Sequence, residues 1–243
     1  MNLRSISISL MTMVAALAVA GCKDVPGRPE PVAARPDQVM NFAVLYKQNC
    51  AGCHGEDGKS GTAISLANPV YLAVAGTNMI QKATADGVSG TLMPAFAESQ
   101  GGMLTDQQIA VLAQGLASRW GKADALGGQS APPYASSSDG DPTQGQTAFG
   151  TFCASCHAAD GTGLKRKQFQ TGSLVDPAYL ALISNQGLRS LIIAGQPEDG
   201  MPDWRSDMTG AGARAMTDKE ITDVVAWLAS HRVAAPGQPY GHP

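Results

Sequence analysis

Residues 50–54 read Cys-Ala-Gly-Cys-His, and residues 153–157 read Cys-Ala-Ser-Cys-His. Both stretches follow the pattern C-x-x-C-H, in which a histidine comes directly after the second of two closely spaced thiols. A redox-active C-x-x-C pair needs no following histidine, and a zinc site needs further ligands. The pattern is instead the attachment signature of a c-type haem.

The chemistry of attachment explains this spacing. Two thiols add across the two vinyl groups of one porphyrin, so both sulfurs must reach neighbouring edges of the same ring. The histidine that follows then lies under the iron as its proximal ligand. The sequence therefore predicts two covalently bound haem c groups, each with one iron. The residues predicted to bind them through these motifs are Cys50, Cys53, His54, Cys153, Cys156 and His157.

The two halves of the chain are similar well beyond these motifs. The offset between matching positions grows from 103 to 108 to 112 along the chain, which indicates short insertions in the second copy. A repeat of about 100 residues is a duplicated domain rather than a solenoid, whose repeats are about 20–50 residues long. The matching segments are Asn68-Pro69 and Asp176-Pro177, Met93-Pro94 and Met201-Pro202, Thr105-Asp106 and Thr217-Asp218, and Leu116-Ala117-Ser118 and Leu228-Ala229-Ser230.

Each copy has the features of a helical domain. Thr105 with Gln108, and Thr217 with Glu220, fit the capping box that begins a helix. The apolar residues that follow each capping box have helical spacing. Asn-Pro and Asp-Pro pairs mark further helix starts, because an N-cap residue precedes a first-turn proline. We expect at least three helices in each domain, little or no sheet, and an all-α fold.

The sixth ligand of each iron is predicted to be a methionine. Met93 and Met201 occupy equivalent repeat positions, and each precedes a proline, which fixes the local backbone. The alternatives are that both methionines fill gaps in the core, or that His231 and His242 supply bis-histidine ligation. Neither histidine has a counterpart in the other repeat. Ligation by His and Met raises the reduction potential and leaves no open position on the iron, which favours electron transfer.

The N-terminus has the features of an export signal. Arg4 precedes a short apolar stretch, and residues 1–21 are predicted to be removed. The stretch ends in Val-Ala-Gly-Cys at 19–22, which resembles the lipobox of bacterial lipoproteins, so we expect Cys22 to be lipidated. The alternative is an ordinary signal peptide with a cysteine close to its cleavage site. Lipidation predicts a protein held by its acyl chains on the periplasmic side of a bacterial membrane.

The composition limits the classes of partner. Charged residues make up 15% of the chain, and the net charge is -3. Binding to nucleic acid depends on clustered lysine and arginine, so no nucleic-acid partner is expected. Four of the five cysteines belong to the two motifs and the fifth is Cys22. No cysteine therefore remains for a structural disulfide or a thiolate axial ligand.

Taken together, the motifs resemble those of a tandem di-haem class I c-type cytochrome, over about residues 40–232. The resemblance implies two small α-helical domains in which the first and last helices cross, usually with a glycine packed against an aromatic residue. We expect a signal peptide at 1–21, a tether at 22–37, domain 1 at 38–121, a linker at 122–141, domain 2 at 142–232 and a tail at 233–243.

Copy one departs from the family at this crossing. Copy two has Gly145 and Trp227, whereas copy one has Phe42 and Gly115 at the equivalent positions. We interpret this as a reciprocal exchange that conserves volume. It predicts that Phe42 packs on Gly115.

The function predicted from the sequence is one-electron transfer by a membrane-anchored carrier. Its partners would be redox proteins or a membrane electron-transfer complex, with a respiratory or photosynthetic donor. The protein would act either as a shuttle or as a subunit, and no small-molecule substrate is expected. The alternative is a haem enzyme of the peroxidase or thiosulfate-oxidising type.

Overall fold

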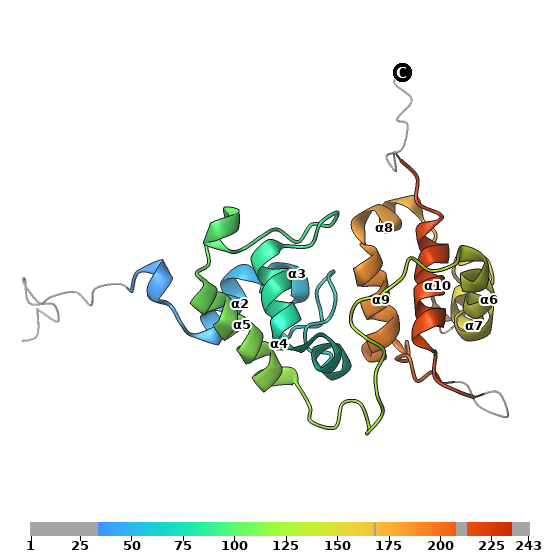
Figure 1. Cartoon of the computed structure of the whole chain (residues 1–243), viewed down its shortest axis with the longest axis horizontal. Coiled ribbons are helices and arrows are strands. Elements are labelled where there is room, and N and C mark those ends of the chain that lie inside the picture. Colours follow the sequence, from blue (N-terminus) through green and yellow to red (C-terminus); the bar gives the residue numbers. More distant parts are fainter. Residues whose placement is uncertain (1–33, 168, 208–212, 235–243) are drawn as a thin grey trace, which may run out of the picture. The chain divides into compact units, whose positions relative to one another are not determined.

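The computed structural model describes residues 34–167, 169–207 and 213–234 (Figure 1). Residues 39–243 form one compact unit, separate from the segment that ends at residue 38. The short 3-10 helix η1 (Pro36–Gln38) belongs to that first segment. The expectations for residues 1–21, for Cys22 and for His242 lie outside the described residues.

The first half of the chain is built from helices. The N-caps follow the sequence: Asn41 caps the first helix, Asn68 caps the one that starts at Pro69, and Thr105 forms a complete capping box with Gln108. Each cap satisfies backbone N–H groups that have no partner within the helix. The elements are α2 (Phe42–Asn49), α3 (Ala51–His54), α4 (Pro69–Asp86), η2 (Glu98–Gln100) and α5 (Asp106–Trp120).

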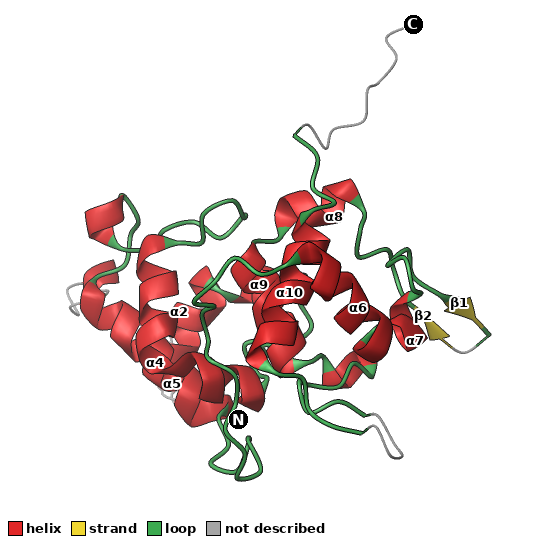
Figure 2. Cartoon of the chain, turned by 45° about the vertical axis from the view of Figure 1, so that its right-hand side comes forward, coloured by secondary structure: helices red, strands yellow, loops and turns green. Residues whose placement is uncertain are grey.

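The second half repeats this order with two additions. One is the pair of short antiparallel strands that projects beside α7 in Figure 2, and the other is a break within the middle helix. Asp141, Asp176 and Thr217 cap the helices that the sequence predicts. The elements are α6 (Pro142–Phe152), α7 (Ala154–His157), β1 (Lys165–Arg166), β2 (Phe169–Gln170), α8 (Pro177–Leu182), α9 (Asn185–Ala194), η3 (Pro197–Asp199) and α10 (Asp218–Ala229).

The middle helix bends in both copies, by different means. In copy one Gly76, with φ 65° and ψ 164°, interrupts α4. Only glycine adopts this conformation without strain. In copy two the chain leaves the helix at Ile183, and the Ser184 side chain then caps α9. Position 76 corresponds to 184 in the repeat, so the bend is preserved although the residues differ.

The helix crossing confirms the exchange between Phe42 and Gly115. A Cβ atom on Gly115 would lie 2.1 Å from Cδ2 of Phe42, so the ring occupies the space that a side chain would need. In copy two, a Cβ atom on Gly145 would lie 2.0 Å from the backbone oxygen of Asp223 and 2.8 Å from Cβ of Trp227. Each crossing is therefore closed by one glycine, on opposite helices.

Copy one also replaces the tryptophan ring that it lacks at this position. A Cβ atom on Gly161 would lie 3.2 Å from the ring of Trp227, and one on the equivalent Gly58 would lie 2.8 Å from the ring of Trp120. Trp120 comes from the last turn of α5 and packs against Tyr46 with 5.2 Å between ring centroids. The same volume is thus filled by a tryptophan from a different turn of the last helix.

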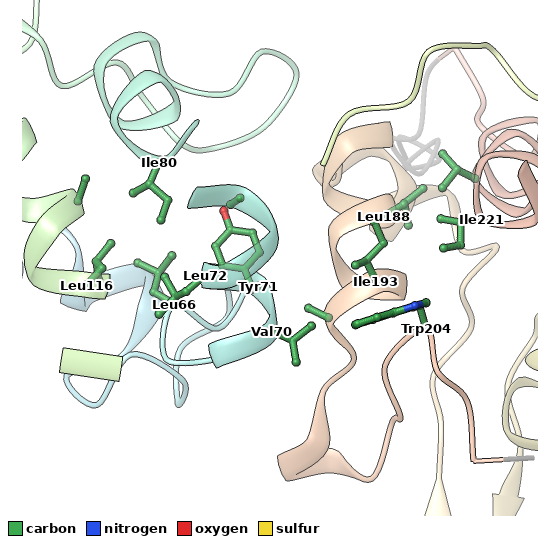
Figure 3. Packing of buried hydrophobic residues seen from close by; sticks show 14 of the residues in the cluster. Leu66, Val70, Tyr71, Leu72, Ile80, Leu116, Leu188, Ile193, Trp204 and Ile221 are labelled. Carbon is green, nitrogen blue, oxygen red and sulfur yellow. The ribbon is translucent and has the colours of Figure 1, made fainter. Parts of the chain in front are cut away.

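The all-α prediction is confirmed, because the two-residue strands β1 and β2 form the only sheet among the described residues. No helix in the part of the chain that the structure describes is both long and apolar enough to span a bilayer. The buried residues come from both copies, and Figure 3 shows them packed along the helices. Leu72, Ile80 and Leu116 are buried in the first half, and Leu188 and Ile221 in the second.

The segment between the halves is held by side chains of the second half. Arg189 on α9 is almost fully buried, and its guanidinium group donates hydrogen bonds to the carbonyl oxygens of Pro133 and Tyr134. It also bonds to Thr222 and pairs with Asp218. Residues 133 and 134 are therefore fixed to α9 and α10, although their composition is that of a linker.

Candidate haem sites

The two C-x-x-C-H motifs have the same backbone geometry. In each, the first cysteine ends one helix and begins a short helix, α3 or α7, that carries the second cysteine and the histidine. The N–H of His54 donates to the Cys50 carbonyl at 3.0 Å, and that of His157 donates to the Cys153 carbonyl at 2.9 Å. The short helix therefore presents two thiols and one imidazole from a single turn.

The thiols are free, and they differ in exposure. Cys53 is exposed, whereas Cys50, Cys153 and Cys156 are half-buried. Burial, with a smaller contribution from the neighbouring thiol, raises the pKa of Cys50 to about 11 and the pKa of Cys153 to about 12. These groups are therefore neutral thiols at neutral pH, the form that carries the hydrogen atom needed for addition to a vinyl group.

His54 is buried and held by one hydrogen bond. Its Nδ1 atom lies 2.8 Å from the carbonyl oxygen of Ile64. Because a carbonyl can only accept, the proton resides on Nδ1, and Nε2 keeps its lone pair for a metal. Burial lowers the pKa of His54, opposed in part by this hydrogen bond. The imidazole is therefore neutral and oriented.

Within the described part of the chain, His157 lacks the hydrogen bond that His54 makes through Nδ1. Its Nδ1 atom is buried and has no hydrogen-bond partner among the described residues. Burial lowers the pKa of this histidine too. Nearby, the Thr171 hydroxyl donates to the carbonyl oxygen of Cys156 at 2.6 Å. In copy one the corresponding carbonyl, that of Cys53, accepts instead from the backbone N–H of Ala63 at 3.0 Å.

The two Met-Pro segments lie on equivalent glycines. Gly87 and Gly195 have positive φ angles of 71° and 67°, and a Cβ atom on either would lie 2.6–2.8 Å from the backbone of the Met-Pro segment that follows. The carbonyl oxygens of Met93 and Met201 accept from the N–H groups of Val88 and Gln196, at 3.1 and 2.9 Å. Both methionines are half-buried. The two loops are thus built alike.

The competing ligand candidates are placed elsewhere. His231 lies at the end of α10, where its Nδ1 atom is 2.9 Å from the carbonyl oxygen of Trp227 and its ring contacts the Trp227 ring. Met103 is 82% exposed, and Met216 is buried in the core. Among the described residues, no group of three or more His, Cys, Asp or Glu is placed to hold a metal ion.

These residues fit haem c. Each motif offers two free thiols on one turn and a neutral imidazole, and the hydrogen bond of His54 leaves Nε2 available to iron. Haem supplies reversible one-electron chemistry when it is bound. The protein's part would be to hold the porphyrin through the cysteines and, in copy one, to orient the imidazole through Nδ1 of His54.

Sequence reasoning did not find two residues that contact these motifs. Ile64 acts through its backbone carbonyl, which no side-chain pattern reveals. Thr171 lies within the longer loop of copy two, and its only signal is the increase in offset between the copies.

Comparison with known families agrees with this geometry. Residues 142–232 match the family described as cytochrome c, and residues 37–114 match the family described as cytochrome c oxidase, cbb3-type, subunit III. No curated protein matches the chain. A solved chain of a reducing HAO-like protein complex from Kuenenia stuttgartiensis is 17% identical and covers 85% of this chain and 100% of its own length. Its TM-score is 0.43, too low to support an argument.

The fold and the two family matches therefore define a protein with all-α cytochrome c domains. Such domains carry covalent haem c and indicate electron transfer. Because each half of the chain has its own match and its own C-x-x-C-H motif, the chain is supported as a di-haem c-type cytochrome.

Proposed function

We propose that this protein relays single electrons between a membrane-associated donor and an acceptor, through one haem c in each domain. The observation that carries the proposal is the pair of C-x-x-C-H turns, each within a match to a cytochrome c family. Each turn has two free thiols beside a neutral histidine, which is buried at position 54 and half-buried at position 157. Purification of the exported protein with two covalently bound haems per chain tests this directly. One haem or none would contradict it.

Met93 and Met201 are proposed as the distal ligands. Their support is the equivalent packing of the two Met-Pro segments on Gly87 and Gly195. A histidine and a methionine at each site would together hold the iron and leave it no open position for a substrate. Such a closed site would suit electron transfer rather than catalysis at the metal.

The methionine assignment is tested by spectroscopy. In the oxidised protein, Met93→Ala and Met201→Ala should each remove about half of the weak red-edge absorption band that a methionine sulfur gives to ferric haem c. Met103→Ala is the matched control, since Met103 is 82% exposed and lies in the same domain as Met93. Absence of the band from the unmodified protein, or an undiminished band in either ligand variant, would refute the assignment.

Membrane attachment is proposed through acyl chains on Cys22, on the periplasmic side of a bacterial membrane. The support is the lipobox-like sequence at residues 19–22. Two or three acyl chains hold a protein stably at a bilayer, whereas one does so only weakly. Mass spectrometry of the mature N-terminus should find a lipidated Cys22. The variant Cys22→Ser should leave the protein unlipidated, and an unmodified residue 22 in the original protein would refute the proposal.

The partner is proposed to be a redox protein or a membrane electron-transfer complex. The family that matches residues 37–114 takes its name from an oxidase subunit, which favours a role beside a respiratory complex. Affinity purification from solubilised membranes separates the two forms of this proposal. A stoichiometric complex identifies a subunit, and its absence identifies a shuttle. Rapid turnover of peroxide or thiosulfate by the pure protein would instead support a haem enzyme.

A further inference from the structure

The two proximal histidines differ in the group that faces their Nδ1 atoms. His54 Nδ1 donates to the Ile64 carbonyl at 2.8 Å. The Nδ1 atom of the half-buried His157 is itself buried, but no acceptor reaches it among the residues that the structure describes. The two otherwise repeated sites are therefore unequal at the atom that controls the donor strength of the ligand.

The loop after each motif explains the difference. In copy one the loop closes where the N–H of Ala67 donates to the carbonyl of Gly58 at 3.0 Å. In copy two it closes where the N–H of Leu174 donates to the carbonyl of Gly161 at 2.8 Å. The second loop is four residues longer, and the hairpin β1–β2 occupies the additional length (Figure 2).

Thr171 sets the path of the longer loop. Its hydroxyl bonds to the Cys156 carbonyl and accepts from the N–H of Leu164 at 2.9 Å. In copy one a backbone N–H, that of Ala63, fills the first of these roles. At the carbonyl of the second cysteine a side chain thus replaces the main chain, while the main-chain N–H of Gly163 donates to the carbonyl of His157 at 3.0 Å. Among the described residues of copy two, no carbonyl oxygen reaches Nδ1 of His157 as the Ile64 carbonyl reaches Nδ1 of His54.

A hydrogen bond at Nδ1 alters the iron through the imidazole. A carbonyl acceptor draws the Nδ1 proton outward and makes the ring a stronger donor. A stronger donor stabilises ferric iron and lowers the reduction potential. Among the described residues His54 has this acceptor and His157 has none, so this hydrogen bond lowers the reduction potential of the first site relative to the second.

The hairpin of copy two acts in the same direction. Lys165, Arg166 and Lys167 are all exposed at β1 and the turn after it, and none of the ion pairs within the described residues includes them. Positive charge beside a haem favours the reduced, less positive state. Both features come from the same insertion.

We propose that the insertion at residues 162–173 makes the two haem sites unequal, with the lower potential in domain 1 and the higher in domain 2, so that electrons enter at domain 1 and leave from domain 2. Ile64 and Thr171 are positioning residues, which act on the iron through the histidines. The inference rests on the proposed electron-relay function and gives that relay a direction.

The unmodified holoprotein provides the first test. Stepwise reduction is followed by NMR, which gives separate signals for the two haems. The reduction potentials of the two haems should differ by at least about 59 mV, which is a tenfold difference in equilibrium constant for a one-electron couple. The Nδ1 proton of His54 should exchange with solvent slowly and that of His157 rapidly. Equal exchange rates, or the lower potential in domain 2, would overturn the proposal.

A loop exchange provides the second test. Residues 162–173 are replaced by the sequence of residues 59–66, which shortens the loop to the length in copy one. The control is the triple variant Lys165→Gln, Arg166→Gln, Lys167→Gln, which removes the charge and keeps the loop length. The exchange should lower the potential of domain 2 further than the control does, and should slow exchange of the His157 Nδ1 proton. Equal potentials in the two variants would refute the role of the hydrogen bond.

These outcomes are distinct from failure of the relay function. If the chain carried fewer than two haems, or turned over peroxide with an open iron, the proposed function would fail before any potential was compared. If it carried two closed haems of equal potential, the proposed electron-relay function would be supported and the proposed direction of transfer would be refuted.

Discussion

The residue after each proximal histidine adopts a backbone conformation that favours glycine. Gly55 has φ 82° and ψ 152°, and Ala158 at the equivalent position has φ 63° and ψ 157°. A residue with a Cβ atom is strained in this region by about 1–3 kcal/mol. The chain reverses direction here so that the loop can return beneath the motif, and copy two tolerates the strain at a functional turn.

We therefore predict that Ala158→Gly stabilises the holoprotein by about 1 kcal/mol, because relief of strain exceeds the entropy that glycine adds to the unfolded chain. Ala159→Gly is the control, since Ala159 is exposed and has no positive φ angle; it should lose up to about 1 kcal/mol. Denaturant unfolding monitored by the haem band measures both. A variant at 158 no more stable than the original protein would count against the strained conformation.

The crossing of the first and last helices also depends on single residues. The two helices pack so closely that one of them must carry a glycine at the contact, but close packing does not determine which helix carries it. Copy one places the ring of Phe42 on Gly115, and copy two places Gly145 against Asp223 and Trp227. Volume is conserved while the residues exchange sides, as expected for a close-packed interior.

At the scale of elements, α10 begins with a capping box that carries a charge. The Thr217 hydroxyl accepts from the N–H of Glu220, and the Glu220 carboxylate accepts from the N–H of Thr217. The Arg214 guanidinium bonds to the same carboxylate. This bond and, to a lesser extent, those of Thr217 lower the pKa of Glu220 to about 2.

This shift makes the start of α10 sensitive to acid. A carboxyl group whose pKa is depressed by folding stabilises the protein at pH values above its ordinary pKa of 4.5, and that contribution disappears as the pH falls toward 2. We expect Glu220→Gln, which keeps an acceptor for the cap, to cost up to about 1 kcal/mol at neutral pH, as for partly exposed ion pairs. Thermal unfolding at a series of pH values should show this difference shrinking between pH 4.5 and 2.

The capping box of copy one provides a control for this prediction. Gln108 already occupies the position of Glu220 and completes its capping box without a charge. The variant Gln108→Ala should therefore lose stability by an amount that does not change over the same pH range. A difference between Glu220→Gln and the original protein that stayed constant down to pH 2 would exclude the ionic contribution.

At the scale of the whole molecule, Asn68 links the two halves within the compact unit of residues 39–243. Its oxygen accepts from the N–H groups of Val70 and Tyr71 and caps α4, while its amide nitrogen donates to the carbonyls of Ala194 and Gly195. These carbonyls end α9, just before the loop that carries Met201. The exposed Asp176, at the equivalent position in copy two, caps α8, and its side chain makes no hydrogen bond of this second kind to any described residue.

We predict that Asn68→Asp costs about 1–3 kcal/mol, although aspartate is an equally good cap. The carboxylate cannot donate, and it would face the carbonyls and the negative end of the α9 dipole. Denaturant unfolding and amide hydrogen exchange of residues 195–201 measure the effect. Asp176→Asn should be nearly neutral. If the two variants changed the free energy of unfolding equally, the hydrogen bonds from Asn68 to the end of α9 would make no contribution to stability.

Much of this molecule could be predicted from local sequence. The capping boxes at Thr105 and Thr217 and the Asn-Pro and Asp-Pro starts are confirmed, because a helix start depends on a few adjacent residues that bond to their own backbone. The break in copy two at Ile183 and the hairpin at residues 165–170 were not predicted. They depend on how a short segment packs against the rest of the chain.

The two attachment turns, the all-α fold and the duplication follow from local sequence, because each is encoded by residues close together in the chain and repeated at matching intervals. The groups that face the imidazoles, in contrast, depend on how the chain folds in space. A backbone carbonyl has no side-chain signature, and whether the carbonyl of Ile64 or the hydroxyl of Thr171 comes close to a motif depends on the path of a loop. The difference in hydrogen bonding at Nδ1 between the two sites is therefore seen in the folded structure and not in the repeated pentapeptides.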